Sequence, residues 1–165
     1  TILSYIEAGK QEGATLVCGG KEVKVAGCEG GYFVEPTIFT NVTNDMKIAQ
    51  EEIFGPVLCV IRYSELDEAI KMANDTIYGL AAGVWTRDVN KAYNVARKLQ
   101  AGVVWINDWH MLRSDAPFGG YKQSGIGREM GQQSLDAYTQ TKHVHTSMSP
   151  ELERRNWYGI LFGQN

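Results

Sequence analysis

The feature that most constrains the fold is an alternation of apolar runs and amphipathic helices in the centre of the chain. Residues 57–63, 79–86 and 102–107 are largely apolar runs, which is typical of strands buried in a sheet. The apolar residues of the first intervening segment recur at helical spacing: Leu66, Ala69, Ile70 and Ala73. The order β-α-β-α-β predicts an α/β fold, with a parallel sheet and right-handed crossovers.

Polar residues mark where the two central helices begin. We expect Ser64 to cap the first helix, with Asp67 near its exposed N–H groups. Asp88 is expected to cap the second helix. The inner face of that second helix is predicted to consist of Val89, Ala92, Ala96 and Leu99.

The flanking segments predict a helix, a hairpin and shorter elements around this unit. Pro36 interrupts a strand pattern at residues 32–39, which indicates an edge or a bend. The remaining predictions are a helix at 1–11, a strand at 14–17, a hairpin or a loop excursion at 21–31, a short helix at 45–52, a helix at 128–138 and a strand at 139–147. Parallel sheets bind ligands beyond the carboxyl ends of their strands, so the loop at 108–127 is where we expect function.

Composition excludes several classes of function. The net charge of −3 offers no basic surface for phosphates, so no nucleic-acid partner is expected. No apolar run is long enough to cross a bilayer, so no membrane partner is expected either. The three cysteines form no Cys-x-x-Cys pair, which favours a reduced, cytoplasmic protein. Because the chain opens at Thr1 inside a predicted helix, we expect it to be a fragment of a longer protein.

Three ordered motifs carry a resemblance to a known family. They are Gln-Glu-Glu-Ile-Phe-Gly-Pro-Val at 50–57, Thr-Ile-Tyr-Gly-Leu-Ala-Ala-Gly-Val-Trp-Thr at 76–86, and Pro-Phe-Gly-Gly-Tyr-Lys-Gln-Ser-Gly-Ile-Gly-Arg-Glu at 117–129. In this order they resemble the C-terminal portion of the aldehyde dehydrogenase superfamily. The resemblance implies that residues 1–137 are part of the catalytic (substrate) domain. It implies that residues 138–165 are an oligomerisation strand and C-terminal tail, through which the chain forms a homo-oligomer.

The resemblance also implies a reaction. Members of the family oxidise an aldehyde to a carboxylic acid through a cysteine thiohemiacetal, with NAD or NADP as acceptor. The nucleophilic cysteine and the general-base glutamate of the family lie upstream of the part matched here. We therefore expect none of Cys18, Cys28 and Cys59 to be the nucleophile, and we expect the chain alone to be inactive.

Two matched residues are implied to bind the cofactor. Glu52 resembles the family glutamate that hydrogen-bonds the nicotinamide ribose, a task suited to a carboxylate that accepts two hydroxyl hydrogens. Phe54 resembles the aromatic residue beside that ribose. The alternatives are a solvated carboxylate for Glu52 and ordinary core packing for Phe54.

The substrate end of the site is implied by the loop at 107–118. Phe118 matches the aromatic residue at the mouth of the substrate tunnel, with Leu112 as a second wall and Asp108 and Trp109 nearby. The run at 105–110 resembles bacterial betaine aldehyde dehydrogenases, and an aromatic beside a carboxylate suits a cationic aldehyde. Alternatively, Trp109 is a surface aromatic fixed by packing.

Glu129 matches a family glutamate near the water and proton route to the active site. It is a candidate relay; the alternative is a carboxylate in the first turn of a helix. The spacing of His143 and His145 is too weak a signal to predict a metal site.

Two other functions compete with the dehydrogenase. One is a non-catalytic oligomerisation or binding module of the same fold. The other is a related reductase of the superfamily, such as a semialdehyde or glutamyl phosphate reductase, against which the Glu52-x-Phe54 pattern argues. The dehydrogenase hypothesis predicts that Glu52 and Phe54 converge with the 108–118 loop on one cleft.

Overall fold

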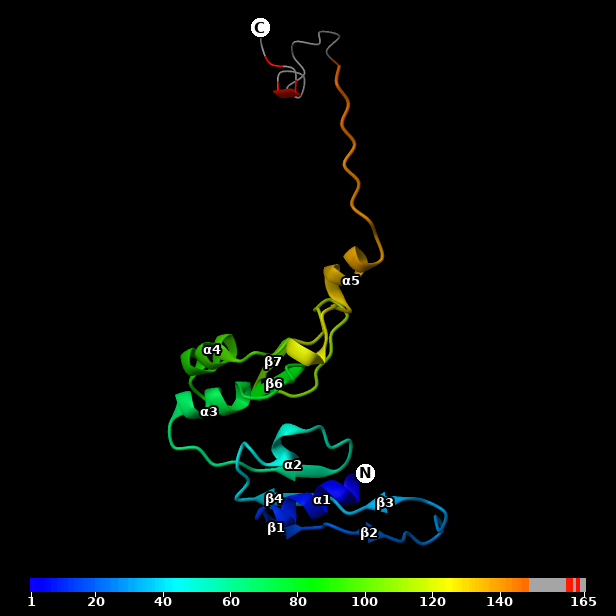
Figure 1. Cartoon of the computed structure of the whole chain (residues 1–165), viewed down its shortest axis with the longest axis vertical. Helices are drawn as coiled ribbons and strands as arrows, with labels where there is room; N and C mark the ends of the chain where they lie inside the picture. Colours follow the sequence, from blue (N-terminus) through cyan, green and yellow to red (C-terminus); the bar gives the residue numbers. More distant parts are fainter. Residues whose placement is uncertain (149–159, 162, 164–165) are drawn as a thin grey trace.

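The computed structural model describes residues 1–148, 160, 161 and 163. Its elements form two layers, from which a long extended arm leads away (Figure 1). The first layer contains α1 (Ile2–Gln11), β1 (Thr15–Cys18), β2 (Glu22–Val23), β3 (Phe33–Val34), β4 (Thr37–Thr40), α2 (Lys47–Gln50) and β5 (Val57–Cys59). The second contains α3 (Leu66–Asn74), β6 (Ala81–Val84), α4 (Val89–Lys98) and β7 (Val103–Ile106). A 3-10 turn, η1 (Lys122–Ser124), and α5 (Gly131–Ala137) follow.

The first layer is organised around β4. β1 pairs with one edge of β4 antiparallel, and β5 pairs with the other edge in parallel. α1 and α2 lie beside this sheet (Figure 1). They contribute Ile6 and Ile48 to a core around Phe39. The core cluster consists of Ile6, Ala14, Phe39, Val42 and Ile48. Pro36 divides the predicted 32–39 strand into β3 and β4, as expected from its missing N–H.

The second layer has the predicted parallel crossover. β6 and β7 pair in parallel from Ala81↔Val103 to Val84↔Ile106, and α4 connects them. Asp88 caps α4 as predicted, because its Oδ1 accepts a hydrogen bond from Lys91 N at 2.9 Å.

Other details of the two central helices correct the sequence prediction. The capping residue of α3 is Glu65, not Ser64, and it forms a reciprocal capping box with Glu68. The inward face of α4 includes Ala92 and Val95, whereas Val89 is 66% exposed. Val89 is the first residue of α4, one turn before the buried Ala92.

The prediction of one continuous βαβαβ sheet is wrong for this structure. β5 pairs with β4 in one sheet, and β6 pairs with β7 in another. Apolar runs identify strands, but pairing depends on which segments meet in space, and after Val60 the chain leaves the β4 edge. The first sheet therefore ends at β5, and Leu58 is 58% exposed there.

The C-terminal predictions are corrected in part. α5 begins at Gly131, so the predicted helix at 128–138 starts later than expected. Residues 139–148 run out as an extended arm that pairs with no strand among the described residues (Figure 1). The apolar tail at 157–162 lies largely outside the described residues. Within the described ranges, no helix is long and apolar enough to span a membrane.

Candidate functional site

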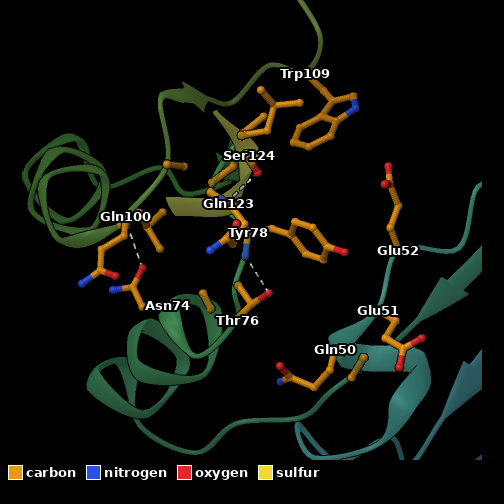
Figure 2. Close-up of a pocket in the computed structure, with 18 residues that line it drawn as sticks. Gln50, Glu51, Glu52, Asn74, Thr76, Tyr78, Gln100, Trp109, Gln123 and Ser124 are labelled. Atoms are coloured by element: carbon orange, nitrogen blue, oxygen red, sulfur yellow. Dashed lines mark hydrogen bonds between the residues drawn. The ribbon is translucent and has the colours of Figure 1, made fainter. Parts of the chain in front are cut away.

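A cavity of about 600 Å³ lies where the two layers meet. One wall is the end of α2 and the residues just after it, with Gln50, Glu51 and Glu52. The opposite wall comes from the ends of α3 and α4, the start of β6, and the loop that contains η1 (Figure 2). Segments far apart in the sequence therefore build one pocket.

Glu52 and Trp109 are the two sequence-predicted residues that line this pocket. They belong to opposite walls, and Figure 2 shows the Glu52 side chain extending toward the side where Trp109 lies. No side-chain hydrogen bond or ion pair of Glu52 is found among the described residues. Its carboxylate is thus free to accept hydrogen bonds from a ligand.

The neighbouring Glu51 is held differently. Its Oε2 accepts a hydrogen bond from the Tyr5 hydroxyl at 2.8 Å, which ties the pocket wall to α1. This hydrogen bond, with smaller contributions from desolvation and from the Glu51 charge, raises the pKa of Tyr5. Both glutamates line the pocket, but the Glu51 carboxylate is already hydrogen-bonded to Tyr5.

Tyr78 and Ser124 line the pocket as well, and sequence reasoning did not single them out. Figure 2 shows the Tyr78 ring projecting into the space between the walls. The Gly79 N–H donates to Ser124 Oγ at 3.0 Å, and Gln123 N donates to Ile77 O at 2.9 Å. These hydrogen bonds join the motif at 76–86 to the motif at 117–129. The sequence shows the two motifs separately, and only the folded chain shows that they form one wall of the pocket.

The remaining loop residues lie outside the pocket lining. Asp108 accepts a hydrogen bond from Trp109 N at 2.8 Å through Oδ1, so it shapes the turn into Trp109. Leu112 is 41% exposed on the same loop. Phe54, beyond Glu52, is 88% exposed. The alternative that Phe54 packs in the core of this chain is therefore excluded. Its ring is free to pack against a ligand or another protein surface.

Phe118 and Glu129 lie directly opposite each other in an antiparallel bridge. Phe118 N donates to Glu129 O at 2.7 Å, and Glu129 N donates to Phe118 O at 2.8 Å. Glu129 precedes α5, so the alternative that it is a first-turn helix carboxylate is wrong. The bridge closes the loop on itself and holds these two residues together, away from the pocket lined by Glu52.

The cysteines and histidines show no second site. Cys59 Sγ lies 3.4 Å from Ile48 O, and burial raises the pKa of its thiol, which disfavours the nucleophilic thiolate. Cys18 and Cys28 are exposed and lie apart from the pocket lining. The rings of His143 and His145 are nearly parallel on the extended arm, with 6.3 Å between their centroids. Across the described part of the chain, no group of three or more metal-binding side chains occurs.

Comparison with known proteins gives a consistent result. A family model described as "Aldehyde dehydrogenase family" matches residues 1–144. Betaine aldehyde dehydrogenase from Brucella anthropi is 56% identical over 147 residues, which cover 89% of this chain and 30% of that protein. Betaine aldehyde dehydrogenase from Bacillus subtilis is 51% identical over 154 residues, covering 93% of this chain and 31% of that protein.

Solved structures agree with the sequence relatives. The NAD+ complex of aldehyde dehydrogenase from Bacillus cereus superposes with a TM-score of 0.85 at 53% identity, covering 90% of this chain and 29% of that one. An apo betaine aldehyde dehydrogenase from Staphylococcus aureus gives a TM-score of 0.88 at 50% identity, covering 92% and 30%. The chain thus spans less than a third of the length of these relatives.

Proposed function

The chain belongs to the aldehyde dehydrogenase family, and from this premise we propose that it forms the C-terminal part of an enzyme that oxidises an aldehyde to a carboxylic acid with NAD or NADP. The observation that carries the proposal is the shared pocket of Glu52 and Trp109. One belongs to the motif implied to bind cofactor, and the other to the loop implied to bind substrate. The nucleophilic cysteine and the general base are proposed to lie in another part of the enzyme.

Glu52 is proposed to bind the cofactor ribose. Its carboxylate lines an open pocket and is uncommitted among the described residues, which fits an acceptor for two vicinal hydroxyl groups. The nicotinamide cofactor would supply the hydride acceptor when bound. The chain's part is to orient it, since correct orientation can lower a barrier by about 7–11 kcal/mol when ideal. The exposed Phe54 ring is proposed to pack against the same nucleotide.

The loop at 108–118 is proposed to form the aldehyde entrance. Trp109 presents an indole to the pocket, and the Asp108 carboxylate is adjacent in sequence. An aromatic face and a nearby carboxylate together favour a cationic aldehyde, by about 0.5–2 kcal/mol for the cation–π contact. Relatives named betaine aldehyde dehydrogenase support this choice of substrate class. Leu112 and Phe118 are proposed to line the outer entrance, and Glu129, bridged to Phe118, to relay protons or water near it.

The extended arm supports a second proposal, association with another copy of the chain. Tyr138, just before the arm, and Val144 and Met148 on it are all at least 75% exposed. The arm therefore carries apolar surface with nothing to cover it among the described residues. An extended segment with unpaired backbone groups readily adds to a sheet edge. A monomer in light scattering at high protein concentration would count against this association. A non-catalytic module of the same fold would associate in the same way but would lack cofactor binding.

Two measurements test the enzyme proposal. The chain alone should form no NADH with any aldehyde; turnover that is abolished by changing Cys18, Cys28 or Cys59 would refute the assignment of the nucleophile to another region. In the complete encoded protein, Glu52→Gln should lower kcat by about 10²-fold, because the cofactor loses its fixed position.

Glu7→Gln is the matched control for Glu52→Gln. Glu7 lies on α1 in an exposed pair with Lys10, so its loss should leave kcat within about twofold. Equal activities of the Glu52 and Glu7 variants would remove Glu52 from the cofactor site. Absence of NADH formation by the complete protein with every aldehyde tested would favour the non-catalytic module.

A further inference from the structure

The side chain of Asn107 extends the β6–β7 ladder beyond its last backbone pair. The regular ladder ends at Val84↔Ile106, followed by a bond from Asn107 N to Val84 O at 2.8 Å. Asn107 Oδ1 then accepts from Thr86 N at 2.8 Å, and Asn107 Nδ2 donates to Thr86 O at 2.9 Å. The side-chain amide thus takes the place of a peptide unit, while the backbone of Asn107 is released to turn.

That turn directs the chain toward the pocket. Asn107 has φ +55°, a left-handed conformation that asparagine tolerates better than most residues. The next residue, Asp108, accepts a hydrogen bond from Trp109 N, and His110 is again left-handed at φ +60°. The loop therefore reverses over the ends of β6 and β7 within a few residues.

Trp109 lies against the sheet in the space left by a glycine. Gly83 pairs with Trp105 across the two strands. A Cβ at Gly83 would lie 3.0 Å from the Trp109 ring and 2.5 Å from the Trp85 ring. The Trp109 ring meets Trp105 edge-on at 5.2 Å between centroids and Trp85 at 6.4 Å, and the Trp105 indole N–H donates to Met111 O at 3.0 Å.

We propose that Asn107 is a positioning residue: its amide pair with Thr86 holds the turn that places the Trp109 indole at the wall of the pocket. The geometry needs both the left-handed backbone and the two side-chain hydrogen bonds, since a glycine would give the first without the second. The role of Asn107 in positioning Trp109 does not depend on the proposed function. Only the expected effect on aldehyde binding rests on the proposed function.

The tryptophan cluster supplies a direct readout in the full 165-residue chain. Indoles at centroid separations of 5.2 and 6.4 Å couple their transitions and give an exciton couplet in circular dichroism. Trp109→Phe should abolish the part of the couplet that arises from coupling of the Trp109 indole to its two neighbours, and this part reports the position of the loop. Asn107→Gly keeps the left-handed backbone but removes both bonds to Thr86. Asn107→Asp keeps the acceptor and replaces the donor with a charge facing a carbonyl oxygen.

The expected result is that Asn107→Gly and Asn107→Asp both lose the Trp109-dependent couplet while the helical signal is kept. Asn41 provides the matched control, because it is left-handed at φ +52° and its Nδ2 donates to Thr15 Oγ1 in the other layer. Asn41→Gly and Asn41→Asp should leave the couplet unchanged. A wild-type couplet in either Asn107 variant, or equal losses in the Asn41 variants, would overturn the proposal.

A measurement on the unaltered chain keeps the proposal testable if the Asn107 variants fail to fold. The side-chain amide protons of Asn107 should exchange with solvent more slowly than those of Asn94, an exposed residue of α4. Equal exchange rates would show that the amide pair is not maintained and would overturn the proposal. In the complete enzyme, Asn107→Gly should raise KM for the aldehyde with kcat unchanged. A raised KM in a variant that keeps the wild-type couplet would still overturn the proposal, because the couplet reports where Trp109 lies.

Discussion

The two layers of the molecule are held together by different interactions. In the β1–β4–β5 layer, the fully buried Phe39 and Ile6 anchor a contiguous apolar core. In the β6–β7 layer, the buried apolar residues are Ile70, Ala92 and Val95, and they do not join that core. Polar side chains that bond to the main chain tie its loops together instead: Asn74, Asn107, Lys122, Ser124 and Arg128.

The difference matches what each layer contributes to the pocket. Glu51 and Glu52 directly follow α2, and α2 is anchored in the apolar core by its residue Ile48. Trp109 and Ser124 stand on loops whose positions depend on directional hydrogen bonds. Apolar packing therefore fixes the pocket wall that contains the two glutamates. Hydrogen bonds set the orientation of the side chains that the loops contribute to the opposite wall. The comparison predicts where each kind of substitution acts.

The largest expected effect is on the core of the first layer. Phe39→Ala should lower the free energy of unfolding by about 3–5 kcal/mol, since it empties a fully buried aromatic site. In the second layer, Val95→Ala should cost about 1–2 kcal/mol, the value of the carbon atoms removed. Denaturant unfolding monitored by circular dichroism measures both. Equal costs for the two substitutions would remove the distinction between the layers.

A clash in the second layer should come next. A Cβ at Gly102 would overlap the carbonyl oxygen of Gly119, and neither backbone has a flexible end to yield. Gly102→Ala should therefore cost about 1–3 kcal/mol and make the loop at 119–124 more sensitive to protease. At Gly127 a Cβ would meet nothing within 4 Å, so Gly127→Ala should stay within about 0.5 kcal/mol of wild type. An equally small effect at Gly102 would show that the loop is not docked on β7.

The cap of α4 should have a smaller effect. Asp88→Ala removes the acceptor for Lys91 N and should cost about 0.5–2 kcal/mol. Asp88→Asn keeps an acceptor oxygen and should restore most of the loss. Thermal unfolding of the two variants provides the comparison. Equal losses for alanine and asparagine would indicate that charge, rather than the hydrogen bond, is responsible.

The smallest expected effect is a pH dependence at the start of α3. Hydrogen bonds from the N–H groups of Ser64 and Glu65 lower the pKa of Glu68 below its usual 4.5. This contribution is complete above the pKa of the unfolded chain and is lost as pH falls through the lower folded pKa. The unfolding temperature of wild type should therefore decline more steeply with acid than that of Glu68→Gln, which keeps an acceptor but does not titrate. Parallel declines would show that the capping box adds no pH dependence.

Local chemistry determined which segments form most of the elements. The helix at Ile2–Gln11, the hairpin around 21–31, the break at Pro36 and the Asp88 cap all follow from spacing and residue type. The predictions failed where a neighbour decided the outcome. Val89 has helical spacing but is largely exposed, and Glu129 pairs with Phe118 before the helix begins.

The sequence by itself determined the family motifs, the strand and helix segments, and the candidate residues Glu52 and Trp109. Only the tertiary structure decided that β5 pairs with β4 and β6 with β7 in separate sheets, and that Glu52 and Trp109 share a pocket with Tyr78. Periodicity reports which face of an element is apolar, a property of nearby residues. Strand pairing and loop docking depend on contacts between residues distant in the chain, and no local pattern contains them.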